Sequence, residues 1–409
     1  MSQKSKFCAV PWNELVYTSQ FNYGVCCIWK DDGNLVSSSE KSDKHYNSAK
    51  MKDLRRRMLN KQEIPECQAC WDNENNNKFS MRMRRNQHYY GVADLQHEDA
   101  EIEHILSDTA KDGSYHTNNI HSLHVSTGDK CQLRCIDCSP AYSRSILKDY
   151  KKLGWDDNFK SRRLVATDNE LRPFAESAHW ESIRQNSYNL KIIRLSGGEP
   201  SINRNFIDYL NWLVEENIAQ NIEIHIPTNC VNIKNNFLEP LKHFGKTVIC
   251  LSVDGIGKLD EYLRYPTNWE KKLENINYMA KVFPESYIHT VVYSLNVLDI
   301  DKIYKWGTQY QLMHSFDMLT FPDELSIRNL PDNLKQIAIN KIKNIIKDLK
   351  GHADVYNKEE FTLNSLNAIL NRLSEPSNPE QWTKCQQIIK GYDTIRKQPL
   401  HEICMDMAY

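Results

Sequence analysis

The sequence has no long apolar run. Among its 409 residues there is no stretch of 18 apolar residues, and the N-terminus has no signal-peptide pattern. These two absences predict a soluble, unexported protein of the cytoplasm that does not cross a membrane.

The chain also has almost no net charge. Its 52 basic residues balance 53 acidic ones, so the formal charge is −1. This balance gives no electrostatic reason to expect binding to nucleic acid or to a membrane surface. Two local basic patches, at 54–58 and 82–86, are typical of solvated helix faces, and no internal repeat is evident.

Cysteine, in contrast, is plentiful, with twelve residues. In a reducing compartment, thiols indicate metal binding or chemistry rather than disulfides. Cys230, Cys250, Cys385 and Cys404 lack a metal-ligand spacing, so we interpret them as small buried or bystander residues. The other eight form two groups.

The first group lies in the segment STGDKCQLRCIDCSP, as Cys131-x3-Cys135-x2-Cys138. Three thiolates at this spacing suit three irons of a [4Fe–4S] cluster, which takes four cysteines when fully ligated. The fourth iron would stay open to a small molecule. A zinc site or three unrelated cysteines are the alternatives, although zinc sites usually show paired C-x2-C knuckles with a fourth ligand nearby.

The segment IIRLSGGEP, residues 192–200, is the second signal. An apolar strand ends in two glycines, an acid and a proline, and a helical pattern follows. Glycines let a backbone approach a ligand closely, and the strand end together with Glu199 offers acceptors for an ammonium group. Alone, this segment would also be typical of an ordinary turn.

From residue 122 onward, apolar strands alternate with helical patterns, which predicts parallel β/α units. We expect strands at 122–126, 192–196, 222–229, 247–255, 287–294 and 315–322. The fold class is therefore α/β, with fewer units than the eight of a closed TIM barrel. Residues 91–120 read as a linker, and the pattern after residue 325 is helical.

The second cysteine group lies in the first 90 residues and consists of Cys8, Cys26, Cys27, Cys67 and Cys70. The Cys67-x2-Cys70 pair has the spacing of a metal knuckle. Five cysteines supply the four needed for one fully ligated cluster, with Cys26 or Cys27 to spare. A structural zinc ribbon is the alternative, since the two kinds of four-cysteine site look alike in sequence.

The triad and the GGEP segment together resemble the radical S-adenosylmethionine (radical SAM) superfamily, although Asp137 stands where an aromatic residue is common. The segments FCxxPW, CC, LRxxML and CxxC resemble its SPASM/twitch module, here placed before the barrel. The resemblance implies a partial (β/α)6 TIM-like barrel at 121–325, a small N-terminal cysteine-rich iron–sulfur domain at 1–90, a linker at 91–120 and a C-terminal helical tail at 326–409.

The resemblance also implies site residues. Cys131, Cys135 and Cys138 would hold a catalytic [4Fe–4S] cluster, and the N-terminal cysteines a second, auxiliary [4Fe–4S] cluster. Gly197, Gly198 and Glu199 would hold the amino group of SAM. Short polar side chains at later strand ends suit its hydroxyl and carboxylate groups; they are Thr228, Asn229, Ser252 and Asp254. Arg264, in the segment YLRYP, is a further candidate because its guanidinium can pair with a carboxylate.

The implied activity is reductive cleavage of SAM to a 5′-deoxyadenosyl radical, which abstracts hydrogen from a peptide or protein residue. The electron would come from a donor such as flavodoxin or ferredoxin, and no peptide-clasp domain is evident. Two alternatives stay open: tailoring of a small metabolite, and a non-catalytic zinc or iron–sulfur binding module.

Overall fold

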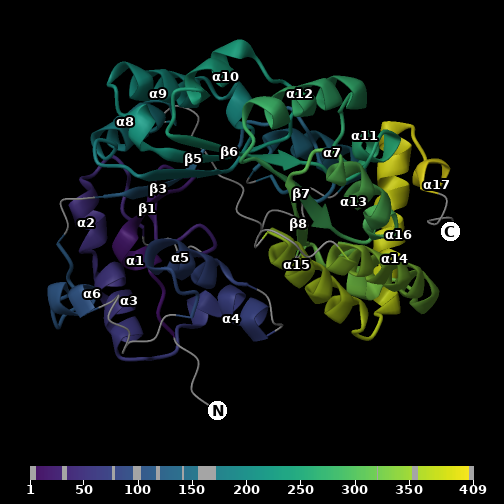
Figure 1. Ribbon diagram of the computed structural model, residues 1–409, viewed down its shortest axis with the longest axis horizontal. Helices are drawn as coiled ribbons and strands as arrows, with labels where there is room; N and C mark the ends of the chain where they lie inside the picture. The colour runs from purple at the N-terminus through teal and green to yellow at the C-terminus, as the bar shows by residue number, and fades with distance from the viewer. Residues whose placement is uncertain are drawn as a thin grey trace.

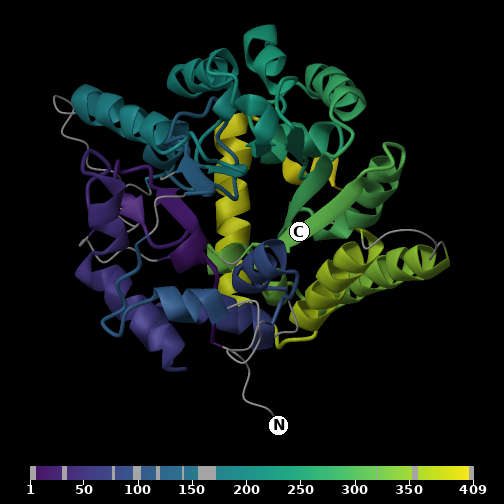
Figure 2. The same ribbon diagram turned by 60° about the vertical axis from the view of Figure 1, so that its left-hand side comes forward.

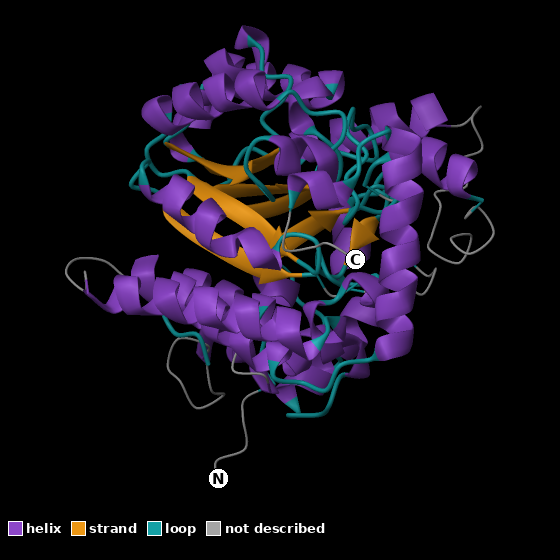
Figure 3. Cartoon of the chain, turned by 90° about the vertical axis from the view of Figure 1, so that its right-hand side faces the viewer, coloured by secondary structure: helices purple, strands orange, loops and turns teal. Residues whose placement is uncertain are grey.

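The computed structural model describes residues 6–29, 35–75, 79–94, 103–116, 120–140, 142–154, 172–319, 321–351 and 358–404. Within these residues, eight strands form one curved sheet of order β2-β1-β3-β4-β5-β6-β7-β8 (Figure 3). The strands are β1 Glu14–Tyr17, β2 Tyr23–Gly24, β3 Ser122–Ser126, β4 Ile192–Ser196, β5 Glu223–Thr228, β6 Lys246–Ser252, β7 Tyr287–Val292 and β8 Met313–Met318.

Every neighbouring pair in this sheet is parallel except β1 and β2. The carboxyl ends of β3 to β8 therefore meet at one edge of the sheet, where α/β barrels place their functional loops. No ladder joins β8 back to β2 in the described part of the chain. The sheet is thus an open, partial barrel.

Helices fall into three sets along the chain (Figure 1). The N-terminal set is α1 Val10–Asn13, α2 Ser42–Tyr46, α3 Ala49–Leu59, α4 Gln68–Asn75, α5 Met81–Tyr90 and α6 Glu103–Asp108. The barrel set is α7 Leu147–Leu153, α8 Arg172–Gln185, α9 Arg204–Glu215, α10 Asn235–Leu241, α11 Lys258–Leu263, α12 Trp269–Val282 and α13 Ile300–Thr308. The C-terminal set is α14 Asp332–Gly351, α15 Lys358–Leu373, α16 Pro379–Arg396 and α17 Leu400–Ile403.

The alternation of side chains along each strand separates an apolar outer face from a polar inner face. Leu123, Ile193 and Ile224 belong to the main apolar core, which the barrel helices cover. The opposite parity carries Glu14, His124 and Arg194, all buried. Polar side chains therefore line the inside of the partial barrel.

The six strands predicted from residue 122 onward are confirmed, and β3 and β4 have the predicted bounds. The sheet is larger than predicted, because β1 and β2 from the N-terminal region extend it past β3. Glu14 of β1 lies opposite Ser122 of β3 in register. The N-terminal region therefore shares the barrel's sheet, and it also has a small apolar core of its own that includes Phe7, Trp12 and Leu54.

The C-terminal tail is helical, as predicted. Its helix α15 packs on the edge strand β8, and α16 runs beside the barrel (Figure 2). At the end of α16, buried Arg396 donates to the carbonyl oxygens of Tyr262 and Arg134, the latter inside the Cys131–Cys138 loop. The tail thus supports the cysteine loop directly. None of the described helices is long and apolar enough to cross a bilayer.

Candidate functional site

The loop after β3 carries Cys131, Cys135 and Cys138. Burial raises the pKa of the Cys135 thiol well above its usual value; Arg264 lowers it, and the other two thiols raise it further. Burial likewise raises the pKa of Cys138, with Asp137 and Cys131 adding to the effect. Charges on the three sulfur atoms would therefore repel one another.

Backbone hydrogen bonds join this loop to the GGE segment. The Gly198 N–H donates to the Gly128 carbonyl at 2.6 Å, and the Glu199 N–H donates to the Lys130 carbonyl at 2.8 Å. A Cβ on Gly198 would lie 2.2 Å from the Lys130 carbonyl oxygen, so only glycine allows this approach. The two sequence motifs are thus in direct contact.

The Glu199 carboxylate is buried and engaged with β5. It accepts hydrogen bonds from the Thr228 hydroxyl at 2.7 Å, the Asn229 N–H at 2.7 Å and the Ser201 N–H at 3.2 Å. Burial raises its pKa, and these donors oppose that rise. A carboxylate has about four acceptor sites, so most are used within the protein. Within the segment, the Gly198 carbonyl accepts from the Thr127 hydroxyl at 3.5 Å and the Glu199 carbonyl from the Ile202 N–H at 3.4 Å.

Asn229, at the end of β5, lies beside the triad. Its amide nitrogen is 3.7 Å from the Cys131 sulfur, and its amide oxygen accepts from the Gln132 side chain at 3.2 Å. The structure therefore gathers Cys131, Glu199 and Asn229, which are far apart in the sequence, at the carboxyl ends of β3, β4 and β5.

The residues expected after β6 are placed differently. Asp254 accepts from the Val291 N–H at 2.9 Å through one carboxylate oxygen, and its other oxygen pairs with Arg264. Both Asp254 carboxylate oxygens are therefore engaged inside the protein, and the Arg264 guanidinium already has a carboxylate partner. To bind the hydroxyl or carboxylate groups of SAM as predicted, Asp254 and Arg264 would have to give up or share this ion pair. Ser252 is half-buried at the strand end, opposite His289 in register.

Asp137 supplies an unsatisfied polar atom next to the triad. Its buried Oδ1 has no hydrogen-bond partner. Burial raises the pKa of this carboxyl to about 6, Asp254 adds to the rise, and Arg264 opposes it. Three thiols and an unpaired carboxyl oxygen on the same loop fit a cofactor that brings both metal and hydrogen-bond donors.

The N-terminal cysteines come from three segments. Burial raises the pKa of Cys8, and charges on Cys67 and Cys70 raise it further. Burial also raises the pKa of Cys26, and charges on Cys27, Cys8 and Cys67 raise it further. The described chain holds no His, Cys, Asp or Glu trio already gathered as ligands of a metal ion.

Cys27 has different neighbours. Burial raises its pKa to about 11. The charge of Glu14 raises this pKa further and the charge of Arg85 lowers it, and both effects are larger than that of Cys70. Glu14 and Arg85 belong to the polar interior of the barrel, so Cys27 lies between that interior and the other N-terminal cysteines.

The buried charges inside the barrel were not predicted from the sequence. Glu14 pairs with Arg85 at 3.1 Å and with Arg194 at 3.2 Å, and the His124 ring is 2.9 Å from the Ser196 hydroxyl. A signal was present: Arg194 interrupts the apolar strand IIRLS at an inward-facing position, and buried charges of this kind are paired.

Comparison with known proteins agrees with this geometry. Residues 125–307 match the sequence model of the Radical SAM superfamily. The matched residues are less than half of the chain and run from the end of β3 to α13. The members of this superfamily are enzymes.

Among curated proteins, the chain is similar to GTP 3′,8-cyclase of Syntrophomonas wolfei subsp. wolfei, with 28% identity over 152 residues, 37% of this chain and 39% of that protein. It is also similar to GTP 3′,8-cyclase of Listeria monocytogenes, with 24% identity over 134 residues and 33% of each chain. The chain thus spans about two-fifths or less of the curated relatives it matches.

Two solved structures show partial similarity. One is anSMEcpe with bound AdoMet and the Cp18Cys peptide, at 17% identity and TM-score 0.39, covering 57% of this chain and 62% of that one. The other is Streptococcus suis SuiB bound to the precursor peptide SuiA, at 13% identity and TM-score 0.35, covering 71% and 63%.

Proposed function

We propose that this protein is a radical SAM enzyme that acts on a peptide or protein residue. The observation that carries the proposal is the contact between the Cys131–Cys138 loop and Gly198–Glu199 at the carboxyl ends of β3 and β4. Cys131, Cys135 and Cys138 would hold a [4Fe–4S] cluster. When bound, this cluster and SAM supply a 5′-deoxyadenosyl radical that takes hydrogen from the substrate.

The residues around the triad would orient and shield these groups. The backbone of Gly197–Glu199 offers carbonyl acceptors for the amino group of SAM, while the Glu199 carboxylate fixes β5 against β4 through Thr228 and Asn229. Asn229 would border the cluster at Cys131. The Asp254–Arg264 pair would place positive charge near the ionised thiolates, which favours their charged form.

The N-terminal cysteines would hold an auxiliary [4Fe–4S] cluster. We assign Cys8, Cys26, Cys67 and Cys70 as its ligands, because Cys26 shares neighbours with Cys8 and Cys67 whereas Cys27 faces Glu14 and Arg85. A site with four protein ligands leaves no iron free for substrate, which suits electron relay from a donor such as flavodoxin or ferredoxin.

Tailoring of a small metabolite is the second candidate function. It is favoured by the similarity to GTP 3′,8-cyclases, which covers 37% and 33% of this chain. The buried Arg85 and Arg194, which share one carboxylate, leave one positive charge in the barrel interior for an anionic group.

Anaerobic reconstitution with iron and sulfide tests the proposal. After reduction and addition of SAM, we expect 5′-deoxyadenosine in the chromatogram, and none from the Cys131→Ala/Cys135→Ala/Cys138→Ala variant. Deuterium carried into 5′-deoxyadenosine from labelled peptide, and not from labelled GTP, would separate the two candidate substrates. Iron-loaded protein that gives no 5′-deoxyadenosine with any labelled substrate would contradict the proposal.

A further inference from the structure

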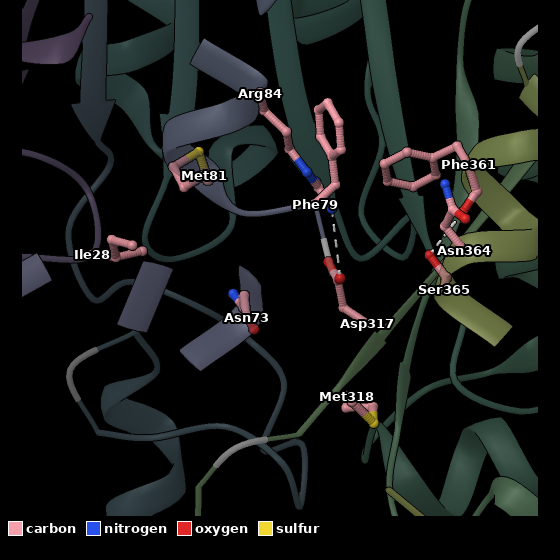
Figure 4. A pocket seen from close by; sticks show the side chains of 10 residues that line it. All are labelled: Ile28, Asn73, Phe79, Met81, Arg84, Asp317, Met318, Phe361, Asn364 and Ser365. Atoms are coloured by element: carbon pink, nitrogen blue, oxygen red, sulfur yellow. Dashed lines mark hydrogen bonds and ion pairs between the residues drawn. The ribbon is translucent and has the colours of Figure 1, made fainter. Parts of the chain in front are cut away.

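A cavity of about 280 Å³ lies where three parts of the chain meet (Figure 4). The loop after Cys27 and helices α4 and α5 form one side, the end of β8 forms the floor, and α15 forms the other side. Its lining residues are Ile28, Asn73, Phe79, Met81, Arg84, Asp317, Met318, Phe361, Asn364 and Ser365. The cavity thus occupies the open side of the partial barrel, beyond the edge strand β8.

The floor of the cavity leads toward the triad. Asp317 is 3.1 Å from the His289 ring and 3.9 Å from the Arg84 guanidinium. His289, on β7, lies opposite Ser252 of β6 in register. The His289 carbonyl accepts from the Val253 N–H at 2.9 Å, next to Asp254 and its partner Arg264. The carbonyl of the preceding residue, Leu263, accepts from the Ile136 N–H of the triad loop at 3.0 Å. A ligand on this floor would therefore lie next to the triad loop.

The opposite wall leads to the N-terminal cysteines. Ile28 directly follows Cys27, and Asn73 is three residues after Cys70, on the same helix α4. Sequence neighbours of Cys27 and Cys70 therefore line this side of the cavity, and a ligand in it would lie near the N-terminal cysteines.

The lining chemistry favours an apolar ligand with amide groups. Half of the lining side chains are apolar: Ile28, Phe79, Met81, Met318 and Phe361. Two amides, Asn73 and Asn364, and the Ser365 hydroxyl offer neutral donors and acceptors that suit a peptide backbone. The volume lies just below the range of about 300–1,000 Å³ typical of small-molecule sites, which suits one large side chain.

The same lining disfavours a polyphosphate. Arg84 is the lining residue with a fixed positive charge, and it faces Asp317 and lies 4.7 Å above the Phe361 ring. A nucleoside triphosphate needs several cationic partners. Its charge would have no such partners among the lining residues.

We propose that this cavity binds an apolar, preferably aromatic, side chain of a peptide substrate and so positions the neighbouring residue beside the triad. The inference rests on the proposed function and specifies its substrate. Phe361 and Phe79 supply the aromatic contacts, since ring pairs prefer offset or edge-to-face packing. The amides and Ser365 bind the adjacent backbone.

Saturation-transfer NMR on the anaerobically reconstituted protein tests this site with three probes: N-acetyl-phenylalanine methylamide, N-acetyl-glutamate methylamide and GTP. We expect the phenylalanine probe to bind, the glutamate probe to bind more weakly, and GTP not to compete with the phenylalanine probe. Phe361→Ala should weaken the phenylalanine probe about tenfold. Tyr278→Ala, which removes an exposed ring on α12, is the matched control and should change nothing.

A second variant tests the cavity independently in case Phe361→Ala does not fold. Asn364 is exposed on α15, so Asn364→Trp should fold and block the cavity entrance, with the same loss of probe binding. Phenylalanine-probe binding that survives in both variants, or GTP displacing that probe, would overturn the inference. Formation of 5′-deoxyadenosine without added substrate, measured in the wild-type protein and in Tyr278→Ala, reports on radical SAM chemistry alone, so failure of the cavity and failure of that chemistry give different results.

Discussion

The two cysteine groups are built in opposite ways. Cys131, Cys135 and Cys138 lie on one loop whose backbone is already held by Gly198, Leu263 and Arg396. The N-terminal cysteines come from three segments separated by up to 40 residues of chain. A metal at the first site would enter a preformed loop, whereas a metal at the second would tie segments together. Loss of the metal at the triad should therefore lower activity, and loss of the metal at the N-terminal cysteines should unfold the N-terminal region.

The largest effect is expected from removing the triad. Cys131→Ala/Cys135→Ala/Cys138→Ala should abolish SAM cleavage, because no cluster with an open iron remains. About four irons per chain should stay on the N-terminal site, as measured by iron analysis beside 5′-deoxyadenosine assays. Complete loss of iron would show that the two sites are not independent and would break the comparison.

Next in size is removal of the N-terminal site. Metal binding by structural cysteine sites supplies on the order of 10 kcal/mol of folding free energy, so Cys67→Ala/Cys70→Ala should leave the N-terminal region unfolded. Hydrogen exchange should show lost protection in α3, whose Met51 and Leu54 belong to the small N-terminal core. Cys385→Ala, which removes a buried thiol from the C-terminal core, should leave α3 protected. Equal protection of α3 in all three proteins would argue against a structural role.

A smaller, sharper change tests the contact between the motifs. Gly198→Ala should push the triad loop away, because its Cβ would meet the Lys130 carbonyl oxygen, and overpacking of this kind costs about 1–3 kcal/mol. Gly245→Ala is the matched control, since its Cβ would lie 2.5 Å from the Gln220 carbonyl oxygen, far along the chain from the triad.

Both glycine variants should lower the unfolding temperature, but only Gly198→Ala should slow SAM cleavage, by about tenfold or more. The comparison uses calorimetry and the rate of 5′-deoxyadenosine formation at equal iron content. A similar loss of the SAM-cleavage rate in Gly245→Ala would show that Gly198→Ala acts through overall stability and not through the contact between the triad loop and the GGE segment.

The smallest effect is a pH dependence of stability outside both cysteine groups. Burial lowers the pKa of His179 and of His314 to about 3, against about 6.5 in the unfolded chain. Between these values only the unfolded state binds the protons. Stability should therefore fall as pH drops below 6.5, by up to about 1.4 kcal/mol per pH unit for each histidine.

Urea unfolding between pH 7 and pH 5 measures this slope. His179→Gln should reduce the slope by the contribution of one proton, whereas His401→Gln, at an exposed site on α17, should leave it unchanged. An identical slope in the wild-type protein and His179→Gln would show that His179 does not remain neutral when folded.

Much of the barrel could be predicted from sequence, because each buried strand from residue 122 onward is an apolar run that ends at turn residues. Strand β1 could not, since parallel pairing of Glu14 with Ser122 spans more than a hundred residues and leaves no local signal. Glu14 also interrupts the apolar pattern expected of a buried strand, and its burial is explained only by its ion pairs with Arg85 and Arg194.

The candidate site shows the same limit. The spacing of Cys131, Cys135 and Cys138 and the GGEP segment predicted which motifs would meet, and they do. The sequence did not predict that Asp254 and Arg264 pair with each other, because each was assigned to a ligand by its position alone. Nor did it predict Arg396, whose contact with the triad loop spans 262 residues.

Electron paramagnetic resonance of the reduced, reconstituted protein is the most direct test of the central claim that Cys131, Cys135 and Cys138 hold the cluster that meets SAM. Adding SAM should change the spectrum of Cys67→Ala/Cys70→Ala, in which the triad remains. It should leave the spectrum of the triple triad variant unchanged. A SAM-dependent change only in the triple variant would contradict the account.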